Sequence, residues 1–219
     1  MNAENITELL RSFVVLDAGQ LAATSTYLDL LIKWNARINL TAVRAPEEMV
    51  TRHFGESFFA AGKLISPGQA ISVIDLGSGA GFPGLPLAIC SPQARVTLIE
   101  ANAKKAAFLN EVISALKLGN VTVVRQRGES YSGSAELVTM RAVEMFARSL
   151  PVAAKLVGAG GRLGLMIGSS QASAAKAGIV EMVWDEAIPI PGSHSRVLLV
   201  GIKKVTVGPS GHGERKVTA

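Results

Sequence analysis

The sequence predicts a doubly wound α/β fold with a mostly parallel sheet and an N-terminal helical extension. First, stretches typical of strands and of helices alternate from residue 71 onward. Second, an apolar, β-branched run at 71–74, typical of a buried parallel strand, leads into a glycine-rich turn. Third, Pro191-Gly192-Ser193-His194 favours a reversing turn, and so an antiparallel pair formed by 180–190 and 196–202.

The first 66 residues are expected to be helical. Residues 4–17 and about 20–38 show the apolar spacing of two helices, with a break near Gly19. A third helix is expected to begin at Pro46, because proline suits the first helical position and two glutamates follow in the positive first turn. This helix carries Arg52 and His53 and continues past the phenylalanines that follow them.

The rest of the chain supplies the sheet. The expected strands are 71–74, 95–99, 121–124, 137–140, 162–167, 180–190 and 196–202. The expected helices between them are 85–89, 104–117, a stretch that ends at 156, and 170–177. We therefore expect N-terminal helices packed on the sheet at 1–66, the sheet domain at 67–204 and a disordered basic tail at 205–219.

Several chemically distinctive residues follow directly after strands. Right-handed crossovers place the carboxyl ends of the first, second and fourth strands along one edge of the sheet. The residues at this edge are expected to converge on a single crevice: Asp75, Gly77, Glu100, Gly128, Glu129 and Arg141.

The glycine-rich turn after the first strand fits two ligand-binding patterns. Residues 79–84 match the dinucleotide pattern G-x-G-x-x-G, with Glu100 downstream as a candidate ribose ligand. Residues 75–81 fit better the loop that binds S-adenosylmethionine, an acidic strand end followed by G-x-G-x-G. Pro83 has no N–H to offer a pyrophosphate, which favours the second pattern. A glycine turn without a ligand is the remaining alternative.

Composition narrows the class of protein. The single cysteine, Cys90, excludes an internal disulfide framework, and no run of 18 apolar residues exists to span a membrane. The N-terminal residues lack the basic-then-apolar pattern of a signal peptide, so we expect a cytoplasmic protein. The net charge of +5 resides in the sheet domain and tail, which fits a polyanion such as RNA, although a solvated basic surface explains it equally well.

Several local motifs together resemble one family. They are Lys33-Trp34-Asn35 with Asn39-Leu40-Thr41, Arg52-His53, the loop 75–86 with its ending Gly81-Phe82-Pro83-Gly84-Leu85-Pro86, and Arg141-Ala142. With these, the sequence resembles the bacterial small-subunit ribosomal RNA guanine-N(7) methyltransferases, once called glucose-inhibited division protein B, from about residue 20 to 203. The resemblance implies a seven-stranded methyltransferase sheet with helices laid against it.

The resemblance also implies a cofactor, a substrate and the residues that bind them. S-adenosylmethionine would be bound by Gly77, Ser78, Gly79, Gly81, Phe82, Glu100, Gly128, Glu129 and Arg141. The partner would be 16S ribosomal RNA or the small subunit, bound by a monomer through Asn35, Asn39, Arg52, His53 and Arg127. No catalytic acid or base and no metal are expected, because nitrogen-7 of guanine has a free lone pair and needs only an in-line approach to the methyl group.

The sequence departs from this family at two positions, and three alternative functions remain. Relatives usually have a lysine where this chain has Ile167, and an aspartate where it has Glu56. The N-terminal helices either shape the RNA entrance or cover one face of the sheet and lid the donor. A methyltransferase acting on another RNA, a protein or a small molecule is the main alternative. A nicotinamide-dependent oxidoreductase and a non-enzymatic RNA-binding protein are the others.

Overall fold

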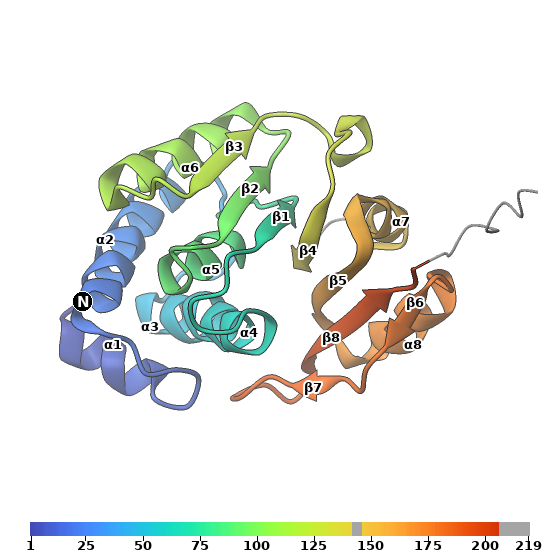
Figure 1. Ribbon diagram of the computed structural model, residues 1–219. Helices are drawn as coiled ribbons and strands as arrows, with labels where there is room; N and C mark the ends of the chain where they lie inside the picture. The colour runs from blue at the N-terminus through green and yellow to red at the C-terminus, as the bar shows by residue number, and fades with distance from the viewer. Residues whose placement is uncertain (142–145, 206–219) are drawn as a thin grey trace, which may run out of the picture.

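The computed structural model describes residues 1–141 and 146–205, and an eight-stranded sheet forms its centre (Figure 1). The strands lie in the order β3-β2-β1-β4-β5-β8-β6, with β7 also paired to β8. Their bounds are β1 Ser72–Leu76, β2 Arg95–Ile99, β3 Val121–Val124, β4 Ala135–Arg141, β5 Val157–Gly168, β6 Met182–Trp184, β7 Ile188–Pro189 and β8 Arg196–Lys203. The expectation of a disordered tail concerns residues outside the described ones, apart from Val205.

The strand directions confirm the doubly wound, mostly parallel prediction. Strands β3, β2, β1, β4 and β5 are mutually parallel, and β8 runs antiparallel to β5. The expected single strand at 180–190 is wrong, because the structure divides it into β6 and β7, both antiparallel to β8. The exposed charged pair Asp185 and Glu186 lies at the break, and the short β7 brings the count to eight.

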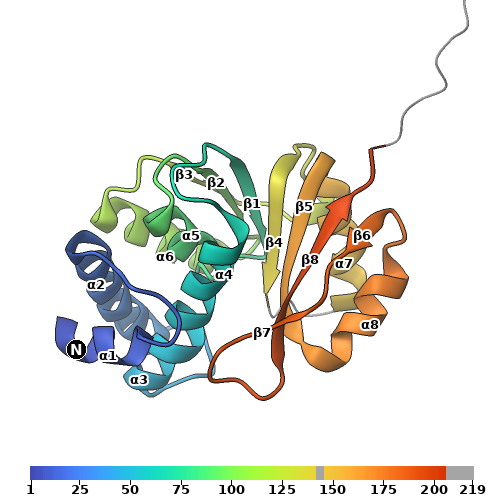
Figure 2. The ribbon, with the colours of Figure 1, turned by 60° about the horizontal axis from the view of Figure 1, so that its bottom comes forward.

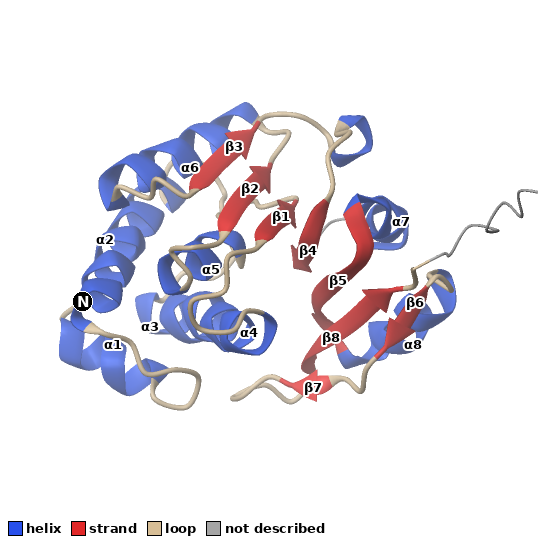
Figure 3. Ribbon diagram, viewed as in Figure 1, coloured by secondary structure: helices blue, strands red, loops and turns tan. Residues whose placement is uncertain are grey.

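Helices cover both faces of the sheet (Figures 2 and 3). Their bounds are α1 Ala3–Leu10, α2 Ala18–Asn35, α3 Pro46–Met49, α4 Glu56–Leu64, α5 Gly84–Cys90, α6 Ala103–Leu116, α7 Phe146–Leu156 and α8 Ser169–Gly178. Helices α1 to α6 lie on one face, and α7 and α8 lie on the other. Successive strand residues alternate between the two cores, since Leu137 packs in the first and Val138 in the second.

The first two helices differ from their predicted bounds. Helix α1 ends at Leu10 rather than at residue 17, and α2 begins before Gly19 rather than after it. The cause is a reciprocal cap, in which Asp17 Oδ1 accepts from Gln20 N at 2.8 Å and Gln20 Oε1 accepts from Asp17 N at 3.0 Å. This capping pair is readable in the sequence and places the break two residues earlier than the glycine suggests.

The third helix begins at Pro46, as predicted, but it is not a continuous α-helix. A π-helical segment, Val50–Gly55, joins α3 to α4 and carries Arg52 and His53. Such segments add a residue to the turn and are frequent at functional sites. Within the described ranges, no helix combines the length and apolar character needed to cross a membrane.

Candidate active site

Two cavities open at the carboxyl ends of the parallel strands. The glycine-loop cavity encloses about 260 Å³ and is lined by Leu76, Gly77, Glu100, Gly128, Glu129 and Val152, among others. The arginine cavity encloses about 400 Å³, and its lining includes Thr41, Arg52, His53, Arg141, Ile167 and Arg196. The sequence predicted one crevice, whereas the structure places Arg141 in the second cavity and Gly77, Glu100, Gly128 and Glu129 in the first. The other predicted residues of the glycine loop, Ser78, Gly79, Gly81 and Phe82, line neither cavity.

The glycine loop after β1 requires glycine for its backbone conformation. Gly77, Gly79 and Gly81 have φ angles of +69°, +57° and +90°, a region that residues with a Cβ seldom adopt. The N–H groups of Gly77 and Ser78 donate to the Ile99 carbonyl at 2.9 and 3.1 Å. These bonds connect the loop to the end of β2, so the two strand ends form a single rigid rim.

Asp75, at the end of β1, anchors the loop from beneath. Its carboxylate is fully buried and accepts from Gly84 N at 3.2 Å and from Thr139 Oγ1 at 2.8 Å. Burial raises the pKa of Asp75 to about 6, and its hydrogen bonds oppose that rise. A Cβ on Gly84 would lie 2.4 Å from Leu98 Cδ2, so helix α5 approaches the sheet closely here. Asp75 therefore holds the loop from inside the protein.

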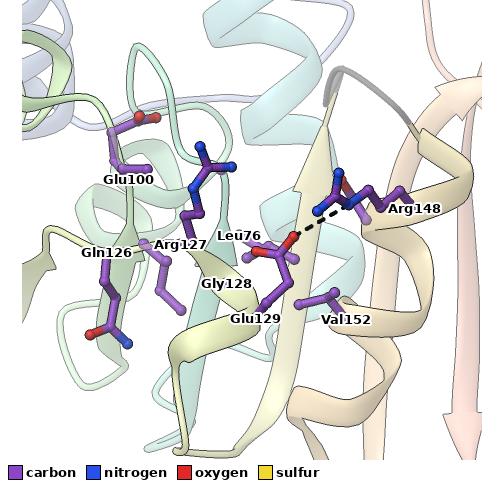
Figure 4. A pocket seen from close by; sticks show the side chains of 12 residues that line it. Leu76, Glu100, Gln126, Arg127, Gly128, Glu129, Arg148 and Val152 are labelled. Atoms are coloured by element: carbon purple, nitrogen blue, oxygen red, sulfur yellow. Dashed lines mark ion pairs between the residues drawn. The ribbon is translucent and has the colours of Figure 1, made fainter.

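Glu100 closes the other side of the glycine-loop cavity. Its two oxygens accept from Gly79 N at 2.9 Å and from Asn102 N at 2.7 Å, and the residue is only 8% exposed. These bonds fix the carboxylate at the cavity wall, directly against the glycine loop. Figure 4 shows Glu100 on the same wall as Gln126, with Arg127 beside them.

The floor of this cavity depends on Gly128, which begins a short 3₁₀ helix. A Cβ there would lie 2.4 Å from Leu76 Cδ1 and 3.2 Å from Val152 Cγ1. The neighbouring Glu129 forms a loose, solvent-exposed ion pair with Arg148 of α7, with 3.8 Å between the charged atoms (Figure 4). The cavity thus combines apolar walls with a fixed carboxylate at one side.

The arginine cavity is built around Glu56, whose side chain is 2% exposed. Its Oε2 accepts from Arg141 Nη2 at 3.2 Å, and its Oε1 accepts from Arg196 Nε at 2.8 Å and lies 2.6 Å from Arg196 Nη2. The two arginines come from the end of β4 and the start of β8, so one carboxylate joins α4 to both strands. Charged groups so deeply buried are tolerated only when they are paired in this way.

His53 lies beside this ion-pair cluster and makes two hydrogen bonds. Its Nδ1 lies 3.3 Å from Arg141 Nη2, and its Nε2 lies 2.7 Å from Thr41 Oγ1. Burial first, and then the charges of Arg141, Arg52 and Arg196, lower the pKa of His53 to about 3. His53 is therefore neutral at physiological pH.

Phe82 joins the two regions through an aromatic cluster. Its ring stacks on Tyr27, with centroids 5.2 Å apart, and on His53, with centroids 5.1 Å apart. The Tyr27 hydroxyl donates to the Ala80 carbonyl within the glycine loop. A Cβ on Gly81 would lie 2.5 Å from that hydroxyl, so the loop and α2 are in close contact. Phe82 packs behind the loop and does not line the glycine-loop cavity.

Three more of the residues predicted to bind a ligand are hydrogen-bonded to other groups of the protein. Asn35 is buried, its Oδ1 accepts from Leu40 N and Thr41 N at 3.0 Å, and its Nδ2 donates to Val43 O. Asn39 is exposed and accepts from Arg44. Buried Ser78 donates to the Asp75 carbonyl. Asn35 closes the turn that presents Thr41, so its influence on a ligand is indirect.

Sequence reasoning missed other residues of the two cavities. Gln126, Arg148 and Val152 line the first, and Arg196 lines the second. Arg148 and Val152 come from α7, which follows β4 at the same edge of the sheet, and this position in the sequence could have predicted them. No sequence feature predicts Arg196, because its partner Glu56 is far away in the chain. Among the described residues, no group of three acidic, histidine or cysteine side chains is placed to hold a metal ion.

Comparison with known proteins decides the family. The sequence profile of the family described as rRNA small subunit methyltransferase G matches residues 20–191. A protein named ribosomal RNA small subunit methyltransferase G from Xanthomonas axonopodis pv. citri is 44% identical over 155 residues, covering 70% of this chain and 71% of that protein. This chain belongs to the rRNA small subunit methyltransferase G family.

A more distant relative and a solved structure support the same family and the same fold. The methyltransferase G of Roseiflexus castenholzii is 38% identical over 202 residues, covering 86% of this chain and 85% of the relative. Among solved structures, M. jannaschii TYW2 in complex with AdoMet superposes with a TM-score of 0.54 at 20% identity, covering 68% of this chain and 73% of that one. This chain thus has a Rossmann-like methyltransferase fold.

Proposed function

We propose that this member of the methyltransferase G family transfers a methyl group from S-adenosylmethionine to nitrogen-7 of one guanine in 16S ribosomal RNA. The donor binds in the glycine-loop cavity, and the target base enters the arginine cavity. The observation that carries the proposal is the adjacent placement of these two cavities along one strand edge, in a chain of this family.

The glycine-loop cavity fits the donor in shape and chemistry. Leu76, Val152 and the side-chain-free Gly128 provide apolar surface for an adenine ring. We propose that Glu100 accepts from the two ribose hydroxyls, which its position in the cavity lining, bonded to Gly79 N of the loop, supports. When bound, S-adenosylmethionine supplies an electrophilic methyl group on a cationic sulfur. The solved structure of M. jannaschii TYW2, which shares this fold, contains AdoMet.

The chemistry needs no general base. Nitrogen-7 of guanine has an in-plane lone pair and no proton, so the enzyme must only orient the base and exclude water. His53 suits this role, because its pKa near 3 leaves it neutral and unable to protonate the nucleophile at physiological pH. The ion-pair cluster formed by Glu56, Arg141 and Arg196 keeps the cavity wall rigid.

The target guanine must be one whose nitrogen-7 is accessible. Guanine nitrogen-7 is out of reach in the deep major groove of an RNA helix, so an unpaired or loop guanine is the target. Arg52 and Arg127 belong to the linings of the two cavities, and we propose that they contact phosphates. We further propose that residues 1–66 and 67–204 act together as one monomeric, cytoplasmic enzyme.

A strain lacking this protein tests the proposal. Its 16S RNA should lose a single 7-methylguanosine, detected as the loss of one alkali-induced strand break. Reintroducing the gene on a plasmid should restore the break, whereas a version with Gly79→Val should not. Persistence of the break in the deletion strain would show that the substrate assignment is wrong.

A further inference from the structure

The hydrogen-bond chain that ends at Thr41 fixes the direction of one hydroxyl hydrogen. Arg141 can only donate, so the Nδ1 atom of His53, at 3.3 Å from Arg141 Nη2, must act as the acceptor. A neutral imidazole then carries its proton on Nε2. That proton is donated to Thr41 Oγ1 over 2.7 Å.

Thr41 Oγ1 also receives a second donor. The Val43 N–H donates to it over 3.1 Å, within the turn that Asn35 closes. A hydroxyl oxygen has two lone pairs, and both are now occupied. The hydroxyl hydrogen must therefore point away from His53 and Val43, and Thr41 is part of the lining of the arginine cavity. Thr41 is thus a dedicated donor on the wall of the cavity.

The other polar groups around the cavity reinforce this character. Arg52 and Arg196 line the cavity and can only donate, whereas the donors of Arg141 are bonded to other groups of the protein. Glu56 is occupied by Arg141 and Arg196, and Glu48 pairs with Arg52 at 2.7 Å. The lining therefore favours an occupant that presents acceptors. Among purines, guanine presents two acceptors side by side, N7 and O6, whereas adenine presents N7 beside the N6 amino donor.

We infer that the Thr41 hydroxyl donates to O6 of the target guanine and thereby selects guanine over adenine while leaving nitrogen-7 free to react. This inference depends on the proposed function, since it names the atom by which the same site recognises its base. Thr41 is a specificity-determining residue in this account. His53, Arg141 and Glu56 are positioning residues that act through it, and no group in this chain of bonds changes its proton during the reaction.

The test compares bases that differ at one position. Small-subunit RNA is assembled by ligation so that the target position carries guanine, inosine or 2-aminopurine, which lacks the 6-oxygen, and each RNA is offered both free and reconstituted into small subunits. With the wild-type protein, the methylation rate should be similar for guanine and inosine and on the order of 10- to 100-fold lower for 2-aminopurine. Equal rates for guanine and 2-aminopurine would overturn the inference without any variant being needed.

Two variants at Thr41 test whether its hydroxyl causes the preference for guanine over 2-aminopurine. Thr41→Ser keeps the hydroxyl and should preserve the preference, whereas Thr41→Val should lower the guanine to 2-aminopurine ratio on the order of 10-fold or more relative to wild type. Because intrinsic reactivity differences between the bases are the same for both proteins, they cancel in this ratio of ratios. Calorimetry with S-adenosylmethionine checks that Thr41→Val still folds and binds its donor; a donor-binding variant that keeps the wild-type ratio overturns the inference. A wild-type protein that methylates none of the RNAs contradicts the proposed function instead.

Discussion

Tyr27 and Phe82 stack with their ring planes within 9° of parallel and their centroids 5.2 Å apart. Tyr27 belongs to α2 and Phe82 to the glycine loop, so this pair attaches the N-terminal helices to the loop that shapes the first cavity. The Tyr27 hydroxyl adds a hydrogen bond to the Ala80 carbonyl of the same loop. Tyr27 is completely buried, which means that neither contact can be replaced by water without rearrangement.

Tyr27→Phe should therefore lower both stability and donor affinity. The ring remains stacked, but a buried carbonyl loses its donor, which costs about 1–3 kcal/mol. Urea unfolding followed by circular dichroism measures the stability, and calorimetry measures donor binding. Tyr27→Leu also removes the ring and should cost more than Tyr27→Phe. Equal stability of Tyr27→Phe and wild type would show that the hydroxyl does not hold the loop.

Glu56→Gln should be strongly destabilising. Removing one charge leaves buried Arg141 without its counter-ion, and breaking a buried pair costs roughly 3–5 kcal/mol. Glu48→Gln is the matched control, because its ion pair with Arg52 is exposed and worth about 0–1 kcal/mol. Urea midpoints compare the two variants, and similar small losses for both would contradict the central role of Glu56.

His53 should make stability depend on pH in a defined direction. Its pKa is lowered in the folded protein from 6.5 to about 3, so the unfolded chain binds the additional proton between these values. The stabilisation is complete above about pH 6.5 and is lost as the pH falls toward 3, by at most about 1.4 kcal/mol per pH unit.

This pH effect is measured as the stability difference between wild type and His53→Gln. Subtraction removes the opposite contribution of Asp75, whose raised folded pKa makes stability fall as the pH rises from about 4 to 6. The advantage of wild type over the variant should shrink between pH 6.5 and pH 4. A difference that stays constant over this interval would mean that His53 is protonated in the folded protein.

Gly128→Ala should weaken donor binding at little cost to folding. The new methyl group would project toward Leu76 and Val152 and so reduce the space of the glycine-loop cavity. We expect about a tenfold loss of affinity for S-adenosylmethionine by calorimetry, equivalent to roughly 1.4 kcal/mol. Gly62→Ala in α4 is the control, since nothing lies within 4 Å of its added Cβ. Unchanged affinity in Gly128→Ala would place the donor elsewhere.

Glu100→Ala should lower donor affinity by about 1.5–3 kcal/mol, the range for hydrogen bonds to a charged group. The loss combines missing contacts to the ribose with a freed Gly79 N–H. Glu186→Ala removes an exposed carboxylate on the far edge of the sheet and should leave affinity unchanged. If the two variants bind the donor equally well, Glu100 is not part of the site.

Local patterns in the sequence predict most of the fold. The apolar runs locate β1 to β4, and Pro46 locates the start of the third helix. Gly77, Glu100 and Gly128 follow strand ends and meet at one cavity, as topology requires. The sequence did not predict features that have only a weak local pattern, such as the π-helical segment at 50–55 and the interruption between β6 and β7.

The second cavity was less accessible to sequence reasoning for a physical reason. Glu56 meets Arg196 across 140 positions of sequence, and His53 stacks on Phe82 of a different element. Contacts of this kind depend on how helices are set against the sheet, which periodicity does not specify. The motif that ends at Thr41 is distinctive in the sequence, but it does not predict that His53 and Val43 both donate to the Thr41 hydroxyl oxygen.

Methyl transfer in a purified system tests the proposed function most directly. Small subunits from a strain lacking the protein are incubated with the purified protein and S-adenosylmethionine carrying an isotopically heavy methyl group. Their 16S RNA is then digested and examined by mass spectrometry. We expect one heavy methyl group per RNA, on a single guanine, at nitrogen-7, and none when Gly79→Val replaces wild type. A heavy methyl group on another base or atom, on a ribosomal protein, or on no component at all would contradict the proposed function.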